Sequence, residues 1–214
     1  QPTGVRAVLP VPAGLGIPYS MGQKTMTTQV SCVKEVSFFQ SYLPYIQPYQ
    51  QVIFDFDDTL ALTEIVKRQK IVGFFERAGY DANEVANHLQ NCTRAELVTL
   101  YYSGADVDAE VILAELNRSL ELAYAEVTIP QHHLAVFDLN NASILSAGRQ
   151  NEIEACLKAN HVGGKLPVYI SSGKDKTASL EKLITSSDVL FVGDSQQDET
   201  SAKNLGIDFL RVTT

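Results

Sequence analysis

The sequence predicts an α/β protein: a parallel β-sheet covered by helices on both faces, with a helical block inserted after the first central strand. Short apolar runs alternate with amphipathic segments through residues 141–214. Fully apolar strands of this kind are typical of a sheet that is buried on both faces. A further expected strand, Gln51–Phe56, contains the apolar run Val52-Ile53-Phe54 and is separated from the others by a long stretch of helical periodicity. This separation predicts the insert.

Composition limits the domain count and the class of partner. A chain of 214 residues suffices for one domain with an insert or for two small domains. The formal net charge is −8, and no Lys or Arg run exceeds Lys67-Arg68, which argues against a nucleic-acid-binding protein. No apolar stretch approaches the roughly 18 residues of a membrane span. The cysteines are widely spaced and odd in number, so we expect a reducing, cytoplasmic location.

Residues 1–50 are expected to form an N-terminal arm and a helix that leads into the core. Proline and glycine interrupt the apolar runs of residues 1–30, unlike the apolar centre of a secretory signal. Apolar residues at helical spacing predict the helix over Val33–Ile46. Because such arms often mediate assembly, an oligomer or partner contact through this arm is a further expectation.

The remaining elements follow in chain order from their hydrophobic patterns. The strand at 51–56 contains the apolar run Val52-Ile53-Phe54, and residues 61–126 carry apolar positions at helical spacing with Gly79 as a helix stop. Pro130 closes this helical block. The expected elements beyond it are strand Asn141–Ser146, helix Gln150–Asn160, strand Leu166–Ser171, helix Thr177–Thr185, strand Val189–Gly193, helix Glu199–Leu205 and strand Phe209–Val212.

Carboxylates directly follow two of these strands. Asp55 and Asp57 end the first strand, whereas Asp194 follows the strand Val189–Gly193 and Asp198 lies one helical turn later. In an open parallel sheet, ligands bind at the carboxyl ends of the strands. If the two strands are neighbours, four carboxylates converge, and a hard divalent cation such as Mg²⁺ would relieve their repulsion. The sequence therefore predicts a metal and phosphate site.

Two motifs resemble a known family. DFDDT at Asp55–Thr59 and GDSQQD at Gly193–Asp198 resemble the first and last motifs of the haloacid dehalogenase superfamily of phosphatases. The resemblance is specific because both motifs occur in order, each after an apolar strand. It implies a Rossmann-like three-layer core with an inserted helical cap. The core would comprise residues 51–61 and 128–214, and the cap residues 62–127.

The resemblance also implies a role for each acidic residue. Asp55 would attack phosphorus and become an aspartyl phosphate. Asp57 would protonate the leaving oxygen and then activate water. Magnesium would be held by Asp55, by the backbone carbonyl of Asp57 and by Asp194. Asp198 would support the metal site, and Thr59 is expected to bond to backbone in the turn.

The family has a Ser or Thr at the end of its second core strand and a Lys before its last motif, both in contact with phosphate. Ser146 and Ser171 each end an expected strand. Ser146 is the better match, because only Ser146 leaves a further helix and strand before the lysine. Ala147 could add a backbone N–H donor beside it. Lys174 and Lys176 are both candidates, and Lys176 is favoured because it directly precedes a helix.

The helical insert resembles the small cap of phosphoglycolate-phosphatase-like members, which closes over the site and excludes water. Asn91–Leu97 is similar to the cap loop that reads the substrate, so Arg94 could meet a second anionic group. A helix capped by Thr93, with Arg94 in solvent, is an equal alternative. Asp58 is expected to be solvated or locally hydrogen-bonded. The 4 histidines lack zinc-ligand spacing and are expected at the surface or in linkers.

These features predict a magnesium-dependent phosphomonoester hydrolase that acts on a small phosphorylated metabolite through an aspartyl phosphate. Asp57 favours phosphorus chemistry, because the true dehalogenases of the family lack an acid two residues after the nucleophile. The alternatives are a phosphonate hydrolase, a sugar-phosphate mutase, and a catalytically weak member of the same fold that serves as a binding or assembly module.

Overall fold

A single parallel sheet organises the protein. The computed structural model describes residues 32–104 and 107–214, so the predicted arm over residues 1–31 lies outside the described residues. Within these ranges the strand order is β1-β6-β5-β2-β3-β4, and every pairing is parallel. The strands are β1 (Val33–Ser37), β2 (Gln51–Phe54), β3 (Ala142–Ser146), β4 (Val168–Ile170), β5 (Val189–Gly193) and β6 (Asp208–Thr213).

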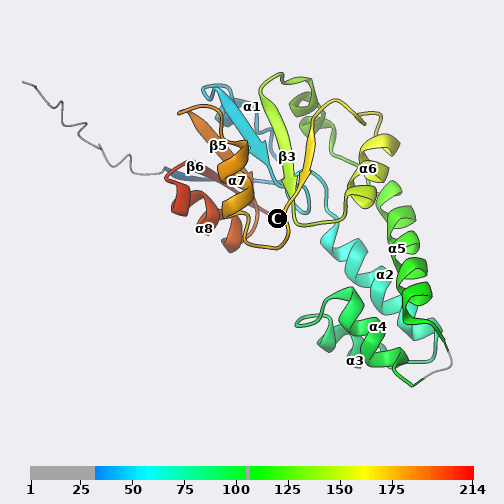
Figure 1. The fold of residues 1–214 in the computed structure, drawn as a ribbon. Coiled ribbons are helices and arrows are strands. Elements are labelled where there is room, and N and C mark those ends of the chain that lie inside the picture. Colours follow the sequence, from blue (N-terminus) through cyan, green and yellow to red (C-terminus); the bar gives the residue numbers. More distant parts are fainter. Residues whose placement is uncertain (1–31, 105–106) are drawn as a thin grey trace, which may run out of the picture.

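Helices flank the sheet, and four further helices form the insert between β2 and β3 (Figure 1). The helices of the core are α1 (Leu43–Ile46), the 3₁₀ helix η1 (Gln131–Asp138), α6 (Gln150–Ala159), α7 (Thr177–Leu183) and α8 (Gln196–Leu205). The helical insert consists of α2 (Glu64–Arg77), α3 (Ala82–His88), α4 (Arg94–Tyr102) and α5 (Ala109–Ala125).

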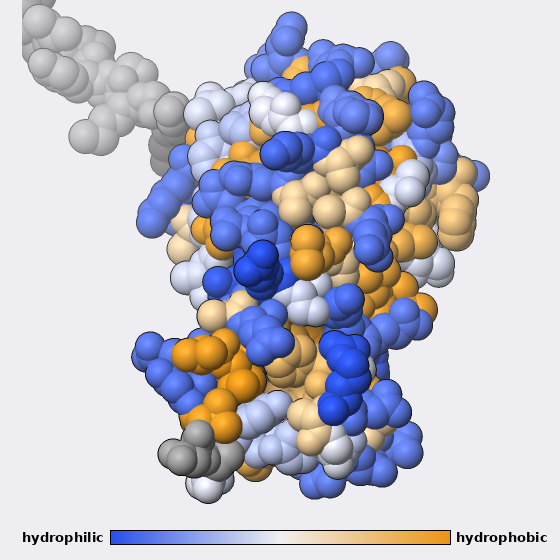
Figure 2. Space-filling model, turned by 90° about the vertical axis from the view of Figure 1, so that its right-hand side faces the viewer, coloured by the Kyte–Doolittle hydropathy of each residue, from blue (hydrophilic) through white to orange (hydrophobic). Residues whose placement is uncertain are grey.

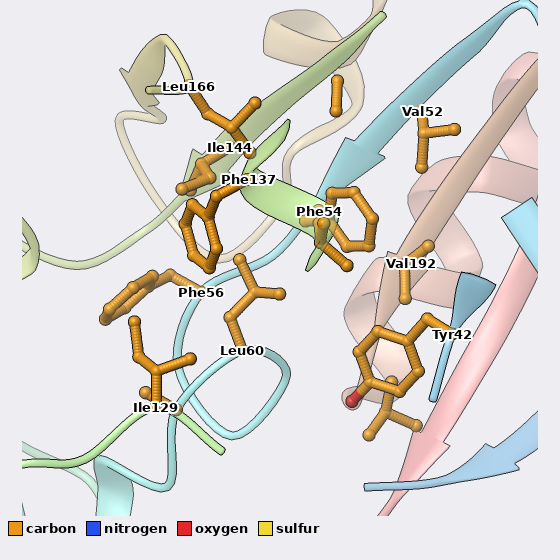
Figure 3. Packing of buried hydrophobic residues seen from close by; sticks show 14 of the residues in the cluster. Tyr42, Val52, Phe54, Phe56, Leu60, Ile129, Phe137, Ile144, Leu166 and Val192 are labelled. Atoms are coloured by element: carbon orange, nitrogen blue, oxygen red, sulfur yellow. The ribbon is translucent and has the colours of Figure 1, made fainter. Parts of the chain in front are cut away.

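Alternate residues of the central strands enter two different hydrophobic clusters. Val52 and Phe54 of β2 belong to the larger cluster, which includes residues of η1 and α6. Ile53 belongs to the smaller cluster, together with Leu180 of α7 and Ala202 of α8. Figure 3 shows Phe54, Phe137 and Ile144 among the labelled residues of the larger cluster. Burial on both faces explains why these strands are largely apolar, and why β5 is apolar at every position.

The helical insert has a core of its own. Each of its four helices contributes buried apolar residues, because each has an apolar stripe at helical spacing. In the space-filling view the insert is the lower lobe of the molecule, and polar and apolar residues are interspersed on the face shown (Figure 2). None of the described helices is long and apolar enough to cross a membrane. The buried residues of this separate core are Ile71, Phe75, Val85, Leu97, Val98, Leu116 and Leu120.

The helix predicted over Val33–Ile46 is wrong for its first part. Residues 33–37 instead form β1, which pairs in parallel with β6 along its whole length. Only Leu43–Ile46 is helical. A short apolar pattern fits a helix or a strand almost equally well, so the unpaired edge of β6 decides the outcome by offering backbone hydrogen bonds.

The other C-terminal elements lie close to their predicted positions, with one informative exception. Helix α8 begins at Gln196 rather than at the predicted Glu199. The Ser195 side chain accepts a hydrogen bond from the Asp198 amide, and the Asp198 side chain accepts one from the Ser195 amide. This reciprocal capping starts the helix directly after β5.

Candidate active site

A cleft of about 680 Å³ lies between the carboxyl ends of the central strands and the helical insert. Its volume is in the range of small-molecule sites, roughly 300–1,000 Å³. Because β2 and β5 are neighbours, the residues that follow them meet at one edge of the sheet. The residues predicted from the sequence that line this cleft are Asp55, Asp57, Arg94, Ser146, Ala147, Lys176, Asp194 and Asp198.

Three carboxylates form a tight cluster in the cleft. Oxygen atoms of Asp55, Asp194 and Asp198 all lie within 4.8 Å of one another. The Lys176 ammonium lies 2.6 Å from Asp55 Oδ1 and 2.8 Å from Asp198 Oδ1. Three negative charges and one positive charge leave two negative charges, which a divalent cation would neutralise. The donors are all oxygen atoms, so these residues fit Mg²⁺. The Asp57 side chain is not part of this cluster.

Burial dominates the electrostatics of the cluster. Burial raises the pKa of Asp55, and the nearby Lys176 opposes this shift. Burial and the neighbouring Asp198 raise the pKa of Asp194 to about 6. Burial acts to lower the pKa of Lys176, but the carboxylates of Asp55 and Asp198 outweigh it and raise this pKa. The carboxylates are therefore held close together at a free-energy cost that a bound cation would relieve.

Asp198 is fixed on both of its carboxylate oxygens. Oδ1 accepts a hydrogen bond from Lys176, and Oδ2 accepts one of 2.5 Å from the Ser195 hydroxyl. A Cβ atom at Gly193 would lie 2.8 Å from the Cβ of Asp198, which explains the glycine at the end of β5. Asp198 thus accepts a hydrogen bond from Lys176 and lies within the carboxylate cluster.

The turn after β2 directs its two remaining polar residues away from the carboxylate cluster. Asp58 has a φ of +53°, and its Oδ1 accepts hydrogen bonds from the amides of Thr63 and Glu64. Asp58 is therefore locally hydrogen-bonded, as predicted, and it satisfies amides at the start of α2. Thr59 does not line the cleft. Its amide bonds to Phe56, but its buried hydroxyl has no partner in the described part of the chain.

Ser146 ends β3 and Ser171 directly follows the neighbouring β4, but their hydroxyls have different surroundings. Ser146 lines the cleft, and its Oγ accepts a hydrogen bond of 2.9 Å from the Gly148 amide. Ser171 is not among the residues that line the cleft, and its hydroxyl donates to the Gly173 carbonyl at 2.6 Å. Lys176 immediately precedes α7, as expected from the sequence, while Lys174 also lines the cleft.

Arg94 connects the helical insert to the core. Thr93 caps α4 as one alternative predicted, but the Arg94 guanidinium is not free in solvent. It forms a bidentate ion pair with the carboxylate of Glu152. Nη1 donates to Oε1, and Nη2 donates to Oε2 at 2.9 Å. Nη1 also donates to Asn117 at 3.3 Å. Glu152 belongs to α6 and is only 1% exposed, so this pair joins α4 to the core.

Two functional candidates were missed in the sequence. The hydroxyls of Thr63 and Tyr124 both donate to Oδ1 of Asp57, at 2.5 and 2.7 Å. Thr63 stands six residues after Asp57, where its proximity could have been suspected. Tyr124 is 67 residues from Asp57 in the sequence. The two residues are brought together by the position of α5, so no local sequence pattern predicts their contact.

Several solved structures have a fold similar to that of this chain. A variant of CbbY from Rhodobacter sphaeroides, in complex with xylulose-(1,5)bisphosphate, is 14% identical, with 78% of this chain and 87% of that chain covered and a TM-score of 0.57. A protein of Bacteroides fragilis described as a haloacid dehalogenase-like hydrolase is 20% identical, with coverages of 77% and 88% and a TM-score of 0.56. A candidate β-phosphoglucomutase of Thermotoga maritima is 16% identical, with coverages of 76% and 83% and a TM-score of 0.56. At these identities the likeness is one of fold.

A family model shows family membership, which similarity of fold alone does not. No curated protein matches the sequence. The model of the family described as haloacid dehalogenase-like hydrolase, however, matches residues 52–212. This match includes both strand-end motifs and every residue of the carboxylate cluster. Since it spans most of the chain, this protein belongs to the haloacid dehalogenase-like hydrolases.

Proposed function

We propose that this hydrolase is a magnesium-dependent phosphatase that cleaves the phosphomonoester of a small metabolite through an aspartyl phosphate on Asp55. One observation carries the proposal: Asp55, Ser146 and Lys176 converge on one cleft together with the acidic pair Asp57 and Asp194. A nucleophile, phosphate-binding groups and a cation site are the parts that phosphoryl transfer requires.

The proposed reaction has two steps. A carboxylate oxygen of Asp55 attacks phosphorus, the bond from phosphorus to the ester oxygen breaks, and Asp57 gives that oxygen a proton, so an alcohol leaves. Asp57 then takes a proton from water, whose oxygen attacks phosphorus, and the bond from phosphorus to Asp55 breaks to release inorganic phosphate. Bound Mg²⁺, held by Asp55, Asp194 and the backbone carbonyl of Asp57, would neutralise negative charge on the phosphoryl oxygens.

The remaining charge would be balanced by the chain itself. The Ser146 hydroxyl and the Ala147 amide are proposed to donate to phosphoryl oxygens, since both residues line the cleft. Lys176 lies 2.6 Å from the Asp55 carboxylate, so its ammonium would be beside the phosphoryl group during attack. Such preorganised donors stabilise the transition state because they need not reorient as charge develops.

The helical insert is proposed to be a cap, with a boundary at residues 62–127, over a core of residues 51–61 and 128–214. Residues of α2 and α4 line the cleft opposite the carboxylate cluster, so the insert would shield the aspartyl phosphate from bulk water. Arg94 is the proposed contact for a second anionic group on the substrate. Because Glu152 already holds its guanidinium, that group would have to compete with Glu152.

A small phosphorylated metabolite is the proposed substrate, a choice supported by the cleft volume and by the xylulose-(1,5)bisphosphate in the related CbbY structure. Phosphonate hydrolysis and sugar-phosphate mutase chemistry are the alternatives, and product analysis separates them. A phosphatase releases inorganic phosphate from an ester, whereas a mutase returns an isomeric sugar phosphate.

The decisive test compares Asp55→Asn with Asp57→Asn. Asp55→Asn should abolish hydrolysis and phosphoenzyme formation, because the attacking carboxylate is lost. Asp57→Asn should lower kcat/KM for an alkyl phosphate by about 100- to 10,000-fold. Its effect on p-nitrophenyl phosphate should be much smaller, since an aryl oxide leaves without protonation. The measurements are initial rates and trapping of the phosphoenzyme, with and without Mg²⁺.

The exposed Asp138, which pairs with Lys165, supplies a control. Asp138→Asn should behave as the unmodified chain does. A covalent phosphoenzyme in Asp55→Asn would place the nucleophile elsewhere, and hydrolysis that persists in excess chelator would remove magnesium from the proposal.

A further inference from the structure

We propose that Tyr124 is a positioning residue that, together with Thr63, orients the Asp57 carboxylate for proton exchange with the substrate. This inference rests on the proposed function, in which Asp57 protonates the leaving oxygen. Tyr124 does not touch the substrate in this proposal. It acts through a single hydrogen bond to Asp57.

Two hydroxyls hold the same oxygen of Asp57. Thr63 Oγ1 lies 2.5 Å and Tyr124 Oη 2.7 Å from Oδ1 of Asp57. Thr63 is 0% and Tyr124 1% exposed, so water does not compete freely for these hydrogen bonds. Burial raises the pKa of the Tyr124 phenol, and the Asp57 carboxylate raises it further. The phenol therefore remains a donor.

The other oxygen of Asp57 faces the phosphate-binding turn. A Cβ atom at Gly148 would lie 2.9 Å from Oδ2 of Asp57 and 3.2 Å from Oγ of Ser146. No hydrogen bond from the described residues reaches Oδ2, in contrast to Oδ1. One oxygen is thus fixed by the protein, and the other is free beside the turn that contains Ser146. A carboxylate held in this way presents one defined oxygen for proton transfer.

The two hydroxyls come from the two places where the chain passes between core and insert. Thr63 directly precedes α2, the first helix of the insert, and Tyr124 lies in the last turn of α5, the final one. The orientation of Asp57 is therefore coupled to both connections of the insert. A movement of the insert relative to the core would change the contacts of Asp57 at the same time.

The test removes one hydroxyl and keeps the ring. Tyr124→Phe should lower kcat/KM for an alkyl phosphate by about 10-fold, a fraction of the effect of removing the acid itself. For p-nitrophenyl phosphate, kcat/KM should change less than about 3-fold, because its leaving group needs little protonation. KM should stay near its original value for both substrates, so the loss appears in kcat.

A matched control exists in the same chain. The Tyr49 hydroxyl also donates to a carboxylate, Asp208, at 2.8 Å, but Asp208 begins β6 at the end of the sheet remote from the cleft. Tyr49→Phe should leave the ratio of the two kcat/KM values unchanged. Thr63→Val removes the second hydroxyl and should reproduce the substrate pattern of Tyr124→Phe, which keeps the test valid if one variant folds poorly.

A double variant shows whether Tyr124 acts through Asp57. Adding Tyr124→Phe to Asp57→Asn should cause no further loss on the alkyl phosphate. Equal losses on both substrates, or a multiplied loss in the double variant, would overturn the inference and leave Tyr124 a structural residue. If Asp57→Asn itself fails to discriminate between the substrates, the proposed acid is wrong. If Asp57→Asn discriminates and Tyr124→Phe does not, only the positioning role is wrong.

Discussion

Ser146 and Ser171 differ in what their hydroxyls contact, although each lies at the carboxyl end of a strand. Ser146→Ala should lower kcat/KM roughly 10-fold or more, because a hydrogen bond to a charged oxygen is worth about 1.5–3 kcal/mol. Ser171→Ala, which removes only a bond to the Gly173 carbonyl, should change it less than about 3-fold. Steady-state kinetics with one phosphate ester suffice. A larger effect at Ser171 would move the phosphate-binding role to β4.

His133 is the residue whose environment departs most from expectation. It was expected at the surface or in a linker, yet it is fully buried in η1 and stacks on Tyr42 with ring centroids 4.3 Å apart. Its Nδ1 lies 3.3 Å from the Leu60 carbonyl. Burial lowers the pKa of His133 to about 4, although its hydrogen bonds oppose this shift.

This burial predicts a pH dependence of stability. Above pH ~6.5 the imidazole is neutral in both states and contributes no difference. As the pH falls from ~6.5 towards 4, the unfolded chain binds a proton that the folded chain excludes, so the contribution of His133 to the free energy of unfolding should fall by roughly 3 kcal/mol. Urea unfolding at pH 7.5 and 4.5 measures the change.

The variant His133→Phe keeps an aromatic ring but cannot titrate, so it should lose less stability over the same interval. The exposed His161, whose φ is +61°, supplies the control His161→Asn, which should follow the original chain. Identical losses in His133→Phe and the original chain would assign the acid sensitivity to other groups.

At the scale of elements, one ion pair joins helix α4 of the insert to helix α6 of the core. Glu152→Gln should weaken this pair and make the Arg94 guanidinium available to a second anionic group of the substrate. The ratio of kcat/KM for a bisphosphate to that for a monophosphate should rise roughly 3- to 10-fold, as a charge-assisted contact is gained. Stopped assays of phosphate release give both constants.

Helix α6 also offers the control. Glu154 is exposed on the same helix and accepts a hydrogen bond from Gln150, so Glu154→Gln should leave the ratio unchanged. If Glu152→Gln also leaves it unchanged, then Arg94 does not read the substrate and serves only to join α4 to α6.

At the scale of the whole molecule, the proposed magnesium site predicts that the stability of the fold depends on the cation. Magnesium at 100 times its dissociation constant should raise the free energy of unfolding by about 2.7 kcal/mol. Asp194→Asn should lose this gain but melt no lower than the original chain without magnesium, because one of the mutually repelling carboxylates is removed. Thermal unfolding with and without magnesium measures both effects.

Asp138→Asn again serves as the control, since Asp138 is exposed and far along the chain from the three carboxylates. It should keep the full magnesium-dependent gain. A gain that survives in Asp194→Asn would show that magnesium binds outside the carboxylate cluster.

The sequence by itself determined the elements whose pattern is local. The strand Val189–Gly193 is apolar at every position and has the predicted bounds, because a strand buried on both faces leaves no polar position. Asp55 and Asp194 could be assigned to one site because parallel strands bring their carboxyl ends to the same edge. Lys176 could be placed because it directly precedes a helix.

Only the tertiary structure decided the features that depend on a distant partner. Residues 33–37 are a strand because β6 offers them an edge, which no pattern within this segment reveals. Arg94 is held by Glu152, and Asp57 by Tyr124, across 58 and 67 residues of chain. A hydrogen bond or ion pair between such residues depends on how the helical insert packs on the core. The local sequence indicates the secondary structure that each segment favours, but not how the segments pack against one another.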